Sequence, residues 1–365
     1  MHNQTIVSEF FLLGLTDVQG LQTFLFALLL IVYLINLAGN SAIMMIVAAE
    51  ARLHSPMYFF LGNLSCLDIC FSTVTLPKLL ANLLSARKAI SFLGCIAQLH
   101  FFHFLGSAEA TLLAVMALDR FVAICRPLHY PVIMSRWVCI LLAGATWATG
   151  FFYALLHSVL MSRLSFCGSR RVPHFFCDIK PLLALACDSI KLHLWLLNTV
   201  TGSVVLGPFF LTLLSYLYLI GFLLLQSRSW RALSKALSTC AAHFSVVILF
   251  YVPVIIAYTS PTLGGSMVQD LVITIVYSVA TPLFNPLIYT LRNRDVKEAL
   301  KKVILRKLCP FSGDRNSHLP QIFTSLRSLK HEWRRHKSTS HLPQAAKLTP
   351  EKLTTLSWHQ PNRHS

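Results

Sequence analysis

The side chains best suited to chemistry in this sequence stand inside or at the ends of apolar runs. An adjacent acid–base pair, Asp119 and Arg120, follows the apolar run "TLLAVMAL". Two further acids, Asp68 and Glu109, each stand alone in a long apolar segment. The pair suits either a surface ion pair on a soluble helix or the point where a membrane helix meets water. Isolated acids inside a membrane are expensive and usually mark a functional site.

Composition decides between these two interpretations. Of the 365 residues, 55% are hydrophobic and only 12% are charged, whereas about a quarter are charged in ordinary soluble domains. A helix of about 20 apolar residues crosses a bilayer. The sequence predicts an all-α membrane protein, a seven-transmembrane helix bundle with a short amphipathic eighth helix. Five segments contain no Asp, Glu, Lys or Arg: 18–49, 137–162, 192–227, 236–269 and 271–291. Two further apolar segments contain a single acid each: 57–77 and 95–118.

The two ends of the chain predict its orientation in the membrane. The first 22 residues contain no Lys or Arg and no small-residue cleavage pattern, so we do not expect a signal peptide. The tripeptide "NQT" makes Asn3 an acceptor for N-glycosylation, which requires the lumenal side. From Arg292 onward the tail contains 16 Lys and Arg against 5 acids, and such positive charge favours the cytoplasm. We therefore expect an extracellular N-terminus and a cytoplasmic C-terminus.

Cysteine positions agree with this orientation. Four of the ten cysteines fall on the expected outer side, namely Cys95, Cys167, Cys177 and Cys187. Cys95 precedes Arg120 by 25 residues, or about 37 Å of helix, so the two lie at opposite membrane faces. An oxidising exterior allows two disulfides among the four cysteines, with three possible pairings. A zinc site built from His174, Cys177 and Asp178 of "HFFCD" is the alternative for this loop.

Six motifs along the chain are similar to those of a known family. They are "GN" at 39–40, "LHSPMYFFLGNLSCLD" at 53–68, "MALDRFVAICRPLHY" at 116–130, "SY" at 215–216, "KALSTCAAHF" at 235–244 and "PLFNPLIYTLRNRDVKEAL" at 282–300. In this order they resemble the motifs of odorant receptors, within the rhodopsin-like G-protein-coupled receptors, over roughly residues 1 to 305. Leu118 and Phe121 stand where that family usually has tyrosines beside the acid–base pair. The tail beyond Leu305 is longer than the family norm.

The resemblance implies a plasma-membrane receptor that activates the olfactory stimulatory G protein and raises cyclic AMP. In the resting state Asp119 would hold Arg120 at the inner end of the third span. Outward movement of the inner ends of spans five and six would free Arg120 to contact the G protein. Pro286 interrupts the helix hydrogen bonds within an NPxxY pattern and allows a hinge. Coupling and activation are thereby assigned to Asp119, Arg120, Tyr216, His243, Asn285, Pro286 and Tyr289.

Asp68 and Glu109 are expected at one depth in the membrane. Asp68 lies 12 residues, or about 18 Å, beyond the inner end of an outward-running helix. Glu109 lies 11 residues, or about 16 Å, before the inner end of an inward-running one. Two such carboxylates suit a sodium ion, with Asn40 and Asn285 as neutral ligands, or else one acid stays protonated. A purely structural polar network is the alternative. The resemblance implies an ion that favours the resting state, and no other cofactor is expected.

The ligand pocket is expected in the outer half of spans three, five, six and seven. Its lining is mostly apolar with a few hydroxyls and one imidazole, which suits a small volatile odorant with one polar group. No carboxylate stands on the outer part of span three, so an amine ligand is not expected. The expected lining residues are Phe102, His103, Gly106, Ser107, Tyr251 and Tyr258. The resemblance also implies the disulfides Cys95–Cys177 and Cys167–Cys187, with Cys95–Cys187 as the alternative pairing.

Other classes of protein find less support in the sequence. It contains no GxSxG, no HExxH and no Gly-rich phosphate-binding loop, so we do not expect an enzyme. A secondary transporter is the main alternative, because buried acids also serve ion coupling. Transporters usually have repeated halves and interrupted helices, and neither is visible in this sequence. We expect membrane lipid as a further partner, and no nucleic acid.

Four regions follow from these patterns. They are an extracellular segment (1–22), the receptor domain (23–292), an amphipathic helix (293–308) and a basic cytoplasmic tail (309–365). The amphipathic helix has Val296 and Leu300 on one side and directs Lys297 and Lys301 toward lipid head groups. The tail is rich in Ser, Thr, His, Lys, Arg and Pro, and it is expected to be disordered.

Overall fold

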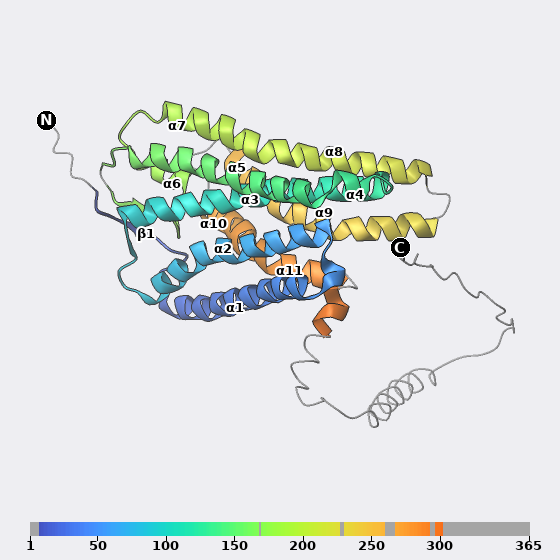
Figure 1. The fold of residues 1–365 in the computed structure, drawn as a ribbon. Helices are drawn as coiled ribbons and strands as arrows, with labels where there is room; N and C mark the ends of the chain where they lie inside the picture. Colours follow the sequence, from blue (N-terminus) through green and yellow to red (C-terminus); the bar gives the residue numbers. More distant parts are fainter. Residues whose placement is uncertain (1–6, 168, 227–229, 260–266, 293–295, 302–365) are drawn as a thin grey trace, which may run out of the picture. The chain divides into compact units, whose positions relative to one another are not determined.

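The computed structural model describes residues 7–167, 169–226, 230–259, 267–292 and 296–301 (Figure 1). The helices are α1 (Gln19–Ala49), α2 (Pro56–Leu84), α3 (Phe92–Cys125), α4 (Tyr130–Ile133), α5 (Arg136–Ser162), α6 (Ile179–Leu183), α7 (Lys191–Leu196), α8 (Gly202–Gln226), α9 (Trp230–Thr259), α10 (Met267–Ile275) and α11 (Thr281–Arg292). A 3-10 turn, η1 (Ala51–Leu53), follows α1. Two π-helical turns, η2 (Leu197–Thr201) and η3 (Val276–Ala280), join α7 to α8 and α10 to α11.

Within the described ranges, seven long helical segments form the bundle that the sequence predicts. Helices α1, α2, α3, α5 and α9 are continuous, while α7–η2–α8 and α10–η3–α11 each form one segment. Five segments are long and apolar enough to cross a membrane, all except α3 and α9. Helix α3 has 34 residues, about 50 Å, and α9 has an apolar part at His243–Tyr258. In Figure 1 the long helices run side by side, with β1, α6 and α7 at one end and α4 at the other.

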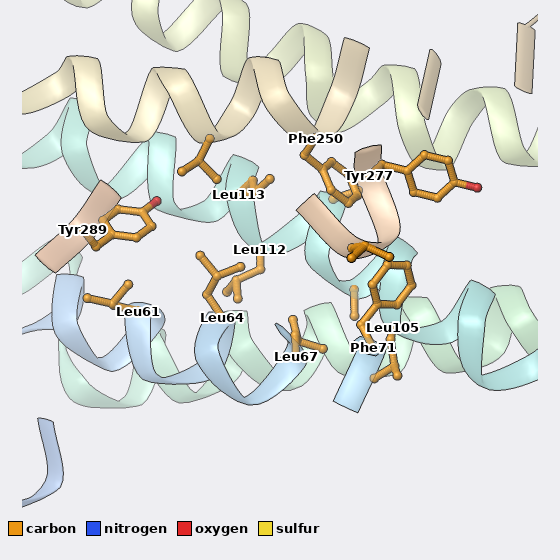
Figure 2. Close-up of a cluster of buried hydrophobic side chains, with 14 of the residues drawn as sticks. Leu61, Leu64, Leu67, Phe71, Leu105, Leu112, Leu113, Phe250, Tyr277 and Tyr289 are labelled. Carbon is orange, nitrogen blue, oxygen red and sulfur yellow. The ribbon is translucent and has the colours of Figure 1, made fainter. Parts of the chain in front are cut away.

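The core of the bundle centres on the contact between α2 and α3. Leu64, Leu67 and Phe71 of α2 are fully buried, as are Leu112 and Leu113 of α3. Figure 2 shows these side chains packed with aromatic rings from α9, η3 and α11. Many apolar side chains of α1, α5 and α8 face outward instead, as lipid-facing helices require.

A glycine sets the distance between α3 and α5. A methyl group built on Gly150 would lie 2.6 Å from the carbonyl oxygen of Phe104 and 3.1 Å from the Cβ of Ala108. Only a residue without a side chain allows this close approach of the two backbones. Because α3 carries four of the six expected ligand-binding residues, Gly150 helps to fix their position.

The end of the bundle at β1, α6 and α7, which we call the outer end, as opposed to the inner end at α4, carries a small sheet that the sequence analysis did not predict. Strand β1 (Glu9–Leu12) pairs antiparallel with β2 (Ala89–Ser91) and parallel with β3 (Arg171–Val172). Phe10 and Leu12 alternate with half-buried residues and are buried beneath the sheet. The N-terminal segment is therefore an integral part of the outer surface of the bundle, joined to two loops distant in sequence.

Beyond α11 the structure describes residues 296–301, which are helical. Val296 is buried and Lys297 and Lys301 are exposed, in agreement with the expected amphipathic pattern. The remaining parts of the predicted 293–308 helix, the 309–365 tail and the glycosylation acceptor Asn3 lie outside the described residues.

Candidate functional site

Two disulfides hold the long loop between α5 and α7 over the outer end of the bundle. The first joins Cys95, at the start of α3, to Cys177, with a Cα–Cα distance of 5.4 Å. The second joins Cys167 to Cys187, with a Cα–Cα distance of 5.7 Å, and closes the loop on itself. These are the pairs that the resemblance implies, in place of the Cys95–Cys187 alternative. The zinc alternative fails because the Cys177 sulfur is in a disulfide, and no cluster of three metal-binding side chains occurs in the described part of the chain.

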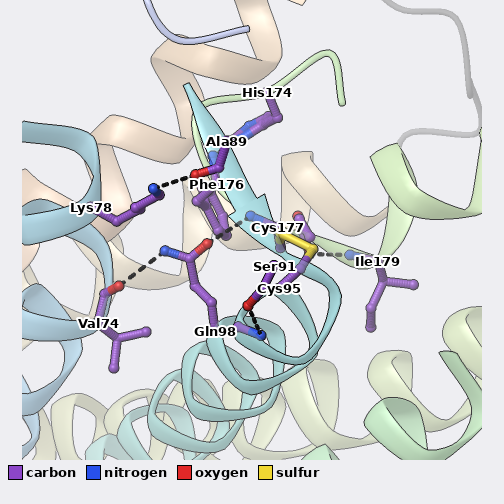
Figure 3. The surroundings of a disulfide bond; sticks show 12 residues. Val74, Lys78, Ala89, Ser91, Cys95, Gln98, His174, Phe176, Cys177 and Ile179 are labelled. Carbon is purple, nitrogen blue, oxygen red and sulfur yellow. Dashed lines mark hydrogen bonds between the residues drawn. A yellow bond between two sulfur atoms is a disulfide. The ribbon is translucent and has the colours of Figure 1, made fainter. Parts of the chain in front are cut away.

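The amide of Gln98 fixes the depth of this loop. Its nitrogen donates to the carbonyl of Val74 on α2 at 3.1 Å, and its oxygen accepts from the backbone N–H of Cys177 at 3.0 Å (Figure 3). Beside it, Lys78 donates to the carbonyl of Ala89 in β2 at 2.6 Å. Gln98 was absent from the predicted site because its partners are distant in sequence.

Asp178 is the main polar contact between this loop and the helices. Its carboxylate lies 2.9 Å from the imidazole Nε2 of His103 and accepts at 3.3 Å from the hydroxyl of Tyr258. It also accepts from the backbone N–H of Ile179 and so caps α6. Burial alone would raise the pKa of Asp178. The hydrogen bond to His103 and the nearby imidazoles of His103 and His174 together have a larger, opposite effect, so the pKa of Asp178 lies below its usual value. Asp178 therefore joins the loop to α3 and α9 as a carboxylate.

Two further loop residues reinforce the outer structure. His174 is buried and stacks on Phe175. Burial lowers the pKa of His174 to about 4, against the opposing effect of Asp178, so the imidazole is neutral at pH 7. Lys180 donates to the carbonyl of Ala257 on α9 at 2.6 Å, and burial lowers its pKa.

A cavity of about 40 Å³ lies beneath the loop, between α2, α3, α5, α8, α9 and the two π-helical turns. Five of the six expected ligand residues line it: Phe102, His103, Gly106, Ser107 and Tyr258. Tyr251 does not line it, and its hydroxyl donates to the carbonyl of Ala110 at 2.6 Å. Its neighbour Phe250, at nearly the same depth on α9, lines the cavity instead, so the direction of the Tyr251 side chain toward α3 keeps it out of the lining.

The cavity has a polar side and an aromatic side. Tyr153 and Thr201 share a hydrogen bond of 2.8 Å near His103 and Tyr258. The apolar part comes from Phe71, Phe102, Phe250 and Val254. Ligand pockets usually measure about 300–1,000 Å³, so a ligand of several heavy atoms has to displace aromatic side chains on entry.

Both π-helical turns contribute a lining residue. Thr201 ends η2 and Tyr277 lies in η3, and both border the cavity. A π-helical turn inserts an extra residue into the helix and often marks a functional site. Neither turn was predicted, because the local sequence of each is compatible with an uninterrupted helix.

Below the cavity the two isolated acids share one polar site. The amide nitrogen of Asn285 donates to both carboxylate oxygens of Asp68 at 3.0 and 3.1 Å. Glu109 is fully buried, and neither of its oxygens makes a hydrogen bond of normal geometry with the described residues, although the Asn285 amide and the Asp68 charge lie near it. The two acids therefore face each other at the depth that the helix arithmetic predicts.

Asn40 occupies a different position from the one expected. Its amide nitrogen donates to the side-chain and main-chain oxygens of Asn36 and, at 3.2 Å, to the carbonyl of Pro282. It bonds to neither acid among the residues that the structure describes. Asn40 thus ties α1 to the helix of Asn285, and Asn285 is the neutral residue that contacts the acid.

At the inner end of α3, Asp119 and Arg120 do not form the expected ion pair within the described chain. Asp119 is buried and accepts from the hydroxyl of Tyr130 at 2.8 Å. Consecutive residues point about 100° apart on a helix, so the two side chains face different neighbours. Tyr130, in the loop helix α4, is the partner that the sequence analysis missed.

Arg120 instead faces the residues expected to take part in activation. Its charge is close enough to act on Tyr216, His243 and Tyr289. The Tyr216 hydroxyl pairs with Nδ1 of His243 and so joins α8 to α9. Pro286 lies inside α11 and packs against the backbone of α1 at Gly39, where an added methyl group would lie 3.3 Å from the proline ring.

Comparison with known proteins agrees with this geometry. A family model described as olfactory receptor matches residues 29–307. The chain belongs to the olfactory receptor family. The receptor is 62% identical to human olfactory receptor 12D1 over 317 residues, covering 87% of this chain and 99% of that protein. It is 64% identical to human olfactory receptor 12D3 over 308 residues (84% and 98%) and 45% identical to chimpanzee olfactory receptor 1E2 over 309 residues (85% and 98%).

Family membership bears on the other expectations. The receptor is a multi-pass membrane protein, and the secondary-transporter alternative finds no support in these matches. Its relatives are described as receptors, which favours a receptor over an enzyme. The matched region of the 12D1 relative covers nearly all of that protein but not all of this chain. The extra length of this receptor relative to the family is consistent with its long tail.

Proposed function

We propose that this olfactory receptor binds a small volatile odorant with one polar group in the cavity beneath the Cys177 loop. The observation that carries the proposal is the mixed lining, with aromatic rings on one side and the His103–Asp178–Tyr258 group on the other. A hydroxyl or carbonyl on the ligand would bond to His103 or Tyr258. Displacement of Phe102 or Phe250 would make room for its apolar part.

The bound receptor activates a stimulatory G protein and raises cyclic AMP. The charge of Arg120 acts on Tyr216, His243 and Tyr289, which belong to three other helices, and this supports a role for the four residues in coupling. Asn285 and Pro286 connect this group to the polar site of Asp68. An odorant that shifts α9 or α11 at the cavity therefore shifts the surroundings of Arg120 as well.

The N-terminus lies outside the cell, with Asn3 glycosylated, and the basic C-terminus lies inside. The two disulfides at the β1 end support this orientation, because disulfides persist in an oxidising exterior. The +11 charge of the tail supports a cytoplasmic location for the other end. Glycosidase treatment tests this orientation. It should change the gel mobility of the wild-type receptor and leave that of Asn3→Gln unchanged.

A sodium ion fits the site between Asp68 and Glu109. Both Glu109 oxygens and the side-chain oxygen of Asn285 lack hydrogen-bond partners among the described residues, and hard cations prefer oxygen ligands. The bound ion would supply the positive charge that two facing carboxylates require. Sodium chloride should then raise the melting temperature of the wild type more than choline chloride does. In Glu109→Gln the difference in melting temperature between the two salts should be smaller. If the wild-type melting temperature rises equally with both salts, no sodium ion is bound, and a proton shared by the two acids explains the site instead.

A screen tests the proposal as a whole. Cells that express the receptor with the olfactory G protein are exposed to a library of volatile compounds, and cyclic AMP is measured. Each active compound is then tested on Ser107→Ala and His103→Phe, which remove polar groups from the lining without a large change in side-chain size. Loss of potency in these variants, without loss of surface delivery, is the expected result. Unchanged potency for every active compound would place the binding site elsewhere.

A further inference from the structure

A second cavity lies far from the odorant cavity, at the opposite end of the bundle. It is an open groove of about 490 Å³ between the ends of α1, α2 and α5 that lie near η1 and α4. We call it the inner groove, and its lining has two parts. The wall toward the membrane interior is apolar and contains Val47, Phe59, Cys139 and Ile140. The rim is polar and contains His54, Ser55 and Arg136.

The rim of the inner groove has basic side chains and no acidic one. Arg136 and His54 are exposed and make no hydrogen bond or ion pair with any residue in the described ranges. Two helix N-termini meet at the same rim, because α2 begins at Pro56 and α5 begins at Arg136. Neither preceding serine caps its helix with its side chain. Each N-terminus adds a partial positive charge and free N–H groups to the charge of Arg136.

The position of the inner groove relative to the bilayer follows from its neighbours. Trp137, beside Arg136, is 75% exposed, and tryptophan side chains gather at the membrane–water interface. Phe59 and Ile140 line the groove and are themselves exposed on the outer faces of α2 and α5. The rim therefore lies at the level of lipid head groups, and the apolar wall opens toward the acyl chains.

We propose that the inner groove binds an anionic phospholipid. The head-group phosphate pairs with the Arg136 guanidinium near the N-termini of α2 and α5, and an acyl chain packs along Phe59 and Ile140. Charge complementarity excludes a zwitterionic lipid as the preferred occupant, because the rim offers cations without a carboxylate for the choline group. A free phosphate is not the expected occupant, because it would leave the apolar wall of the groove uncovered. Anionic lipids are enriched in the cytoplasmic leaflet, so this occupant also agrees with the orientation proposed above.

The test measures lipid binding to the purified full-length receptor in detergent, and so it depends neither on the orientation nor on an odorant. Phosphatidylinositol 4-phosphate is added, and bound lipid is counted by native mass spectrometry across a concentration series. The variant is Arg136→Gln. The matched control is Arg163→Gln, which removes an exposed arginine at the other end of the same helix. The basic tail and Lys297 are unchanged in all forms, so their general attraction for anionic lipid cancels in the comparison.

We expect Arg136→Gln to weaken the tightest bound lipid about tenfold and Arg163→Gln to leave it unchanged. Ile140→Trp, which narrows the apolar wall and keeps the charge, should also weaken binding of the lipid. Melting curves of each variant without added lipid verify that the fold is retained. Equal binding by all variants would overturn the proposal. Binding of inorganic phosphate or phosphatidylcholine as tight as that of phosphatidylinositol 4-phosphate would also overturn it. Tighter binding of cholesterol than of the anionic lipid, unchanged in Arg136→Gln, would do the same.

Discussion

The outer and inner ends of this receptor are held together in different ways. At the outer end, two disulfides, a three-stranded sheet and the Asp178 carboxylate join the loops to α3 and α9. At the inner end, α8 and α9 meet through the Tyr216–His243 hydrogen bond. Two buried polar atoms there, the His243 Nε2 and the Tyr289 hydroxyl, have no partner in the described part of the chain.

This difference suggests how one fold can both hold a ligand and respond to it. The outer end is cross-linked, so it provides a fixed frame for the cavity. The inner end contains groups that can exchange partners at little cost, as a two-state element requires. Buried polar atoms without partners cost free energy in one state and can be satisfied in another. Binding in the cavity can therefore be converted into movement at the inner end.

The largest expected effect comes from removing the charge at the inner end. Arg120→Ala should abolish odorant-driven cyclic AMP, because the variant lacks the cation that faces Tyr216 and His243. Surface delivery should be close to wild type, since Arg120 lies outside the outer cross-links. The matched control is Arg126→Ala, six residues further along, where the side chain is exposed. Wild-type potency in Arg120→Ala would remove Arg120 from the coupling mechanism.

Breaking either outer disulfide should reduce stability, and the disulfide that closes the longer loop should have the larger effect. The disulfides span 82 and 20 residues, and loop-closure entropy assigns them about 4.5 and about 3 kcal/mol. Cys95→Ser should therefore lower the melting temperature of the purified receptor more than Cys167→Ser does. The reverse order would show that the second disulfide, and not the link to α3, is the principal tie at the outer end.

The smallest expected effect concerns acid. The pKa of His174 is about 4 in the folded receptor because the imidazole is buried, whereas an unfolded histidine has a pKa of about 6.5. As the pH falls through this window the unfolded chain binds the proton first, so folding loses about 2 kcal/mol between pH 7.5 and pH 5. Asp178 does not contribute there, since its lowered pKa affects stability only below about pH 4.

Melting temperatures across this pH range provide the measurement. His174→Gln should remove the part of the dependence that His174 contributes, and His54→Gln, at an exposed position, should leave the dependence unchanged. A wild-type melting temperature that does not change from pH 7.5 to pH 5 would mean that His174 is not buried in the neutral form.

The parts of the fold that the sequence could predict depend on local patterns. Apolar runs of about 20 residues are sufficient to locate membrane helices, and the described helices agree. Helix geometry alone placed Asp68 and Glu109 at one depth, where Asn285 now links α11 to Asp68. Five cavity residues were predicted because they lie on the outer parts of spans three and six, where the resemblance implies a pocket.

The parts that were missed depend on contacts between distant segments. Strand β1 pairs with residues about 80 and 160 positions away, and no local sequence pattern predicts such pairing. The roles of Gln98, Asp178 and Tyr130 arise from the same kind of contact. Tyr251 was wrongly assigned to the cavity because its hydrogen bond to the Ala110 carbonyl on α3 is another such long-range contact.

One measurement tests most directly whether the outer end stays fixed while the inner end moves. Spin labels on unnatural amino acids, which leave the native cysteines intact, are placed in two pairs at the two ends of α3 and of the α7–η2–α8 segment, with Leu128 in the turn just beyond α3. The inner pair is Leu128 and Leu225, which are 90% and 91% exposed, and the outer pair is Leu93 and Leu192, which are 78% and 57% exposed. Distances are measured by pulsed electron resonance with and without an odorant from the screen. The inner distance should change by several ångströms, and the outer distance should stay within about 1 Å. An outer change as large as the inner one, or no inner change with a saturating agonist, would contradict the account.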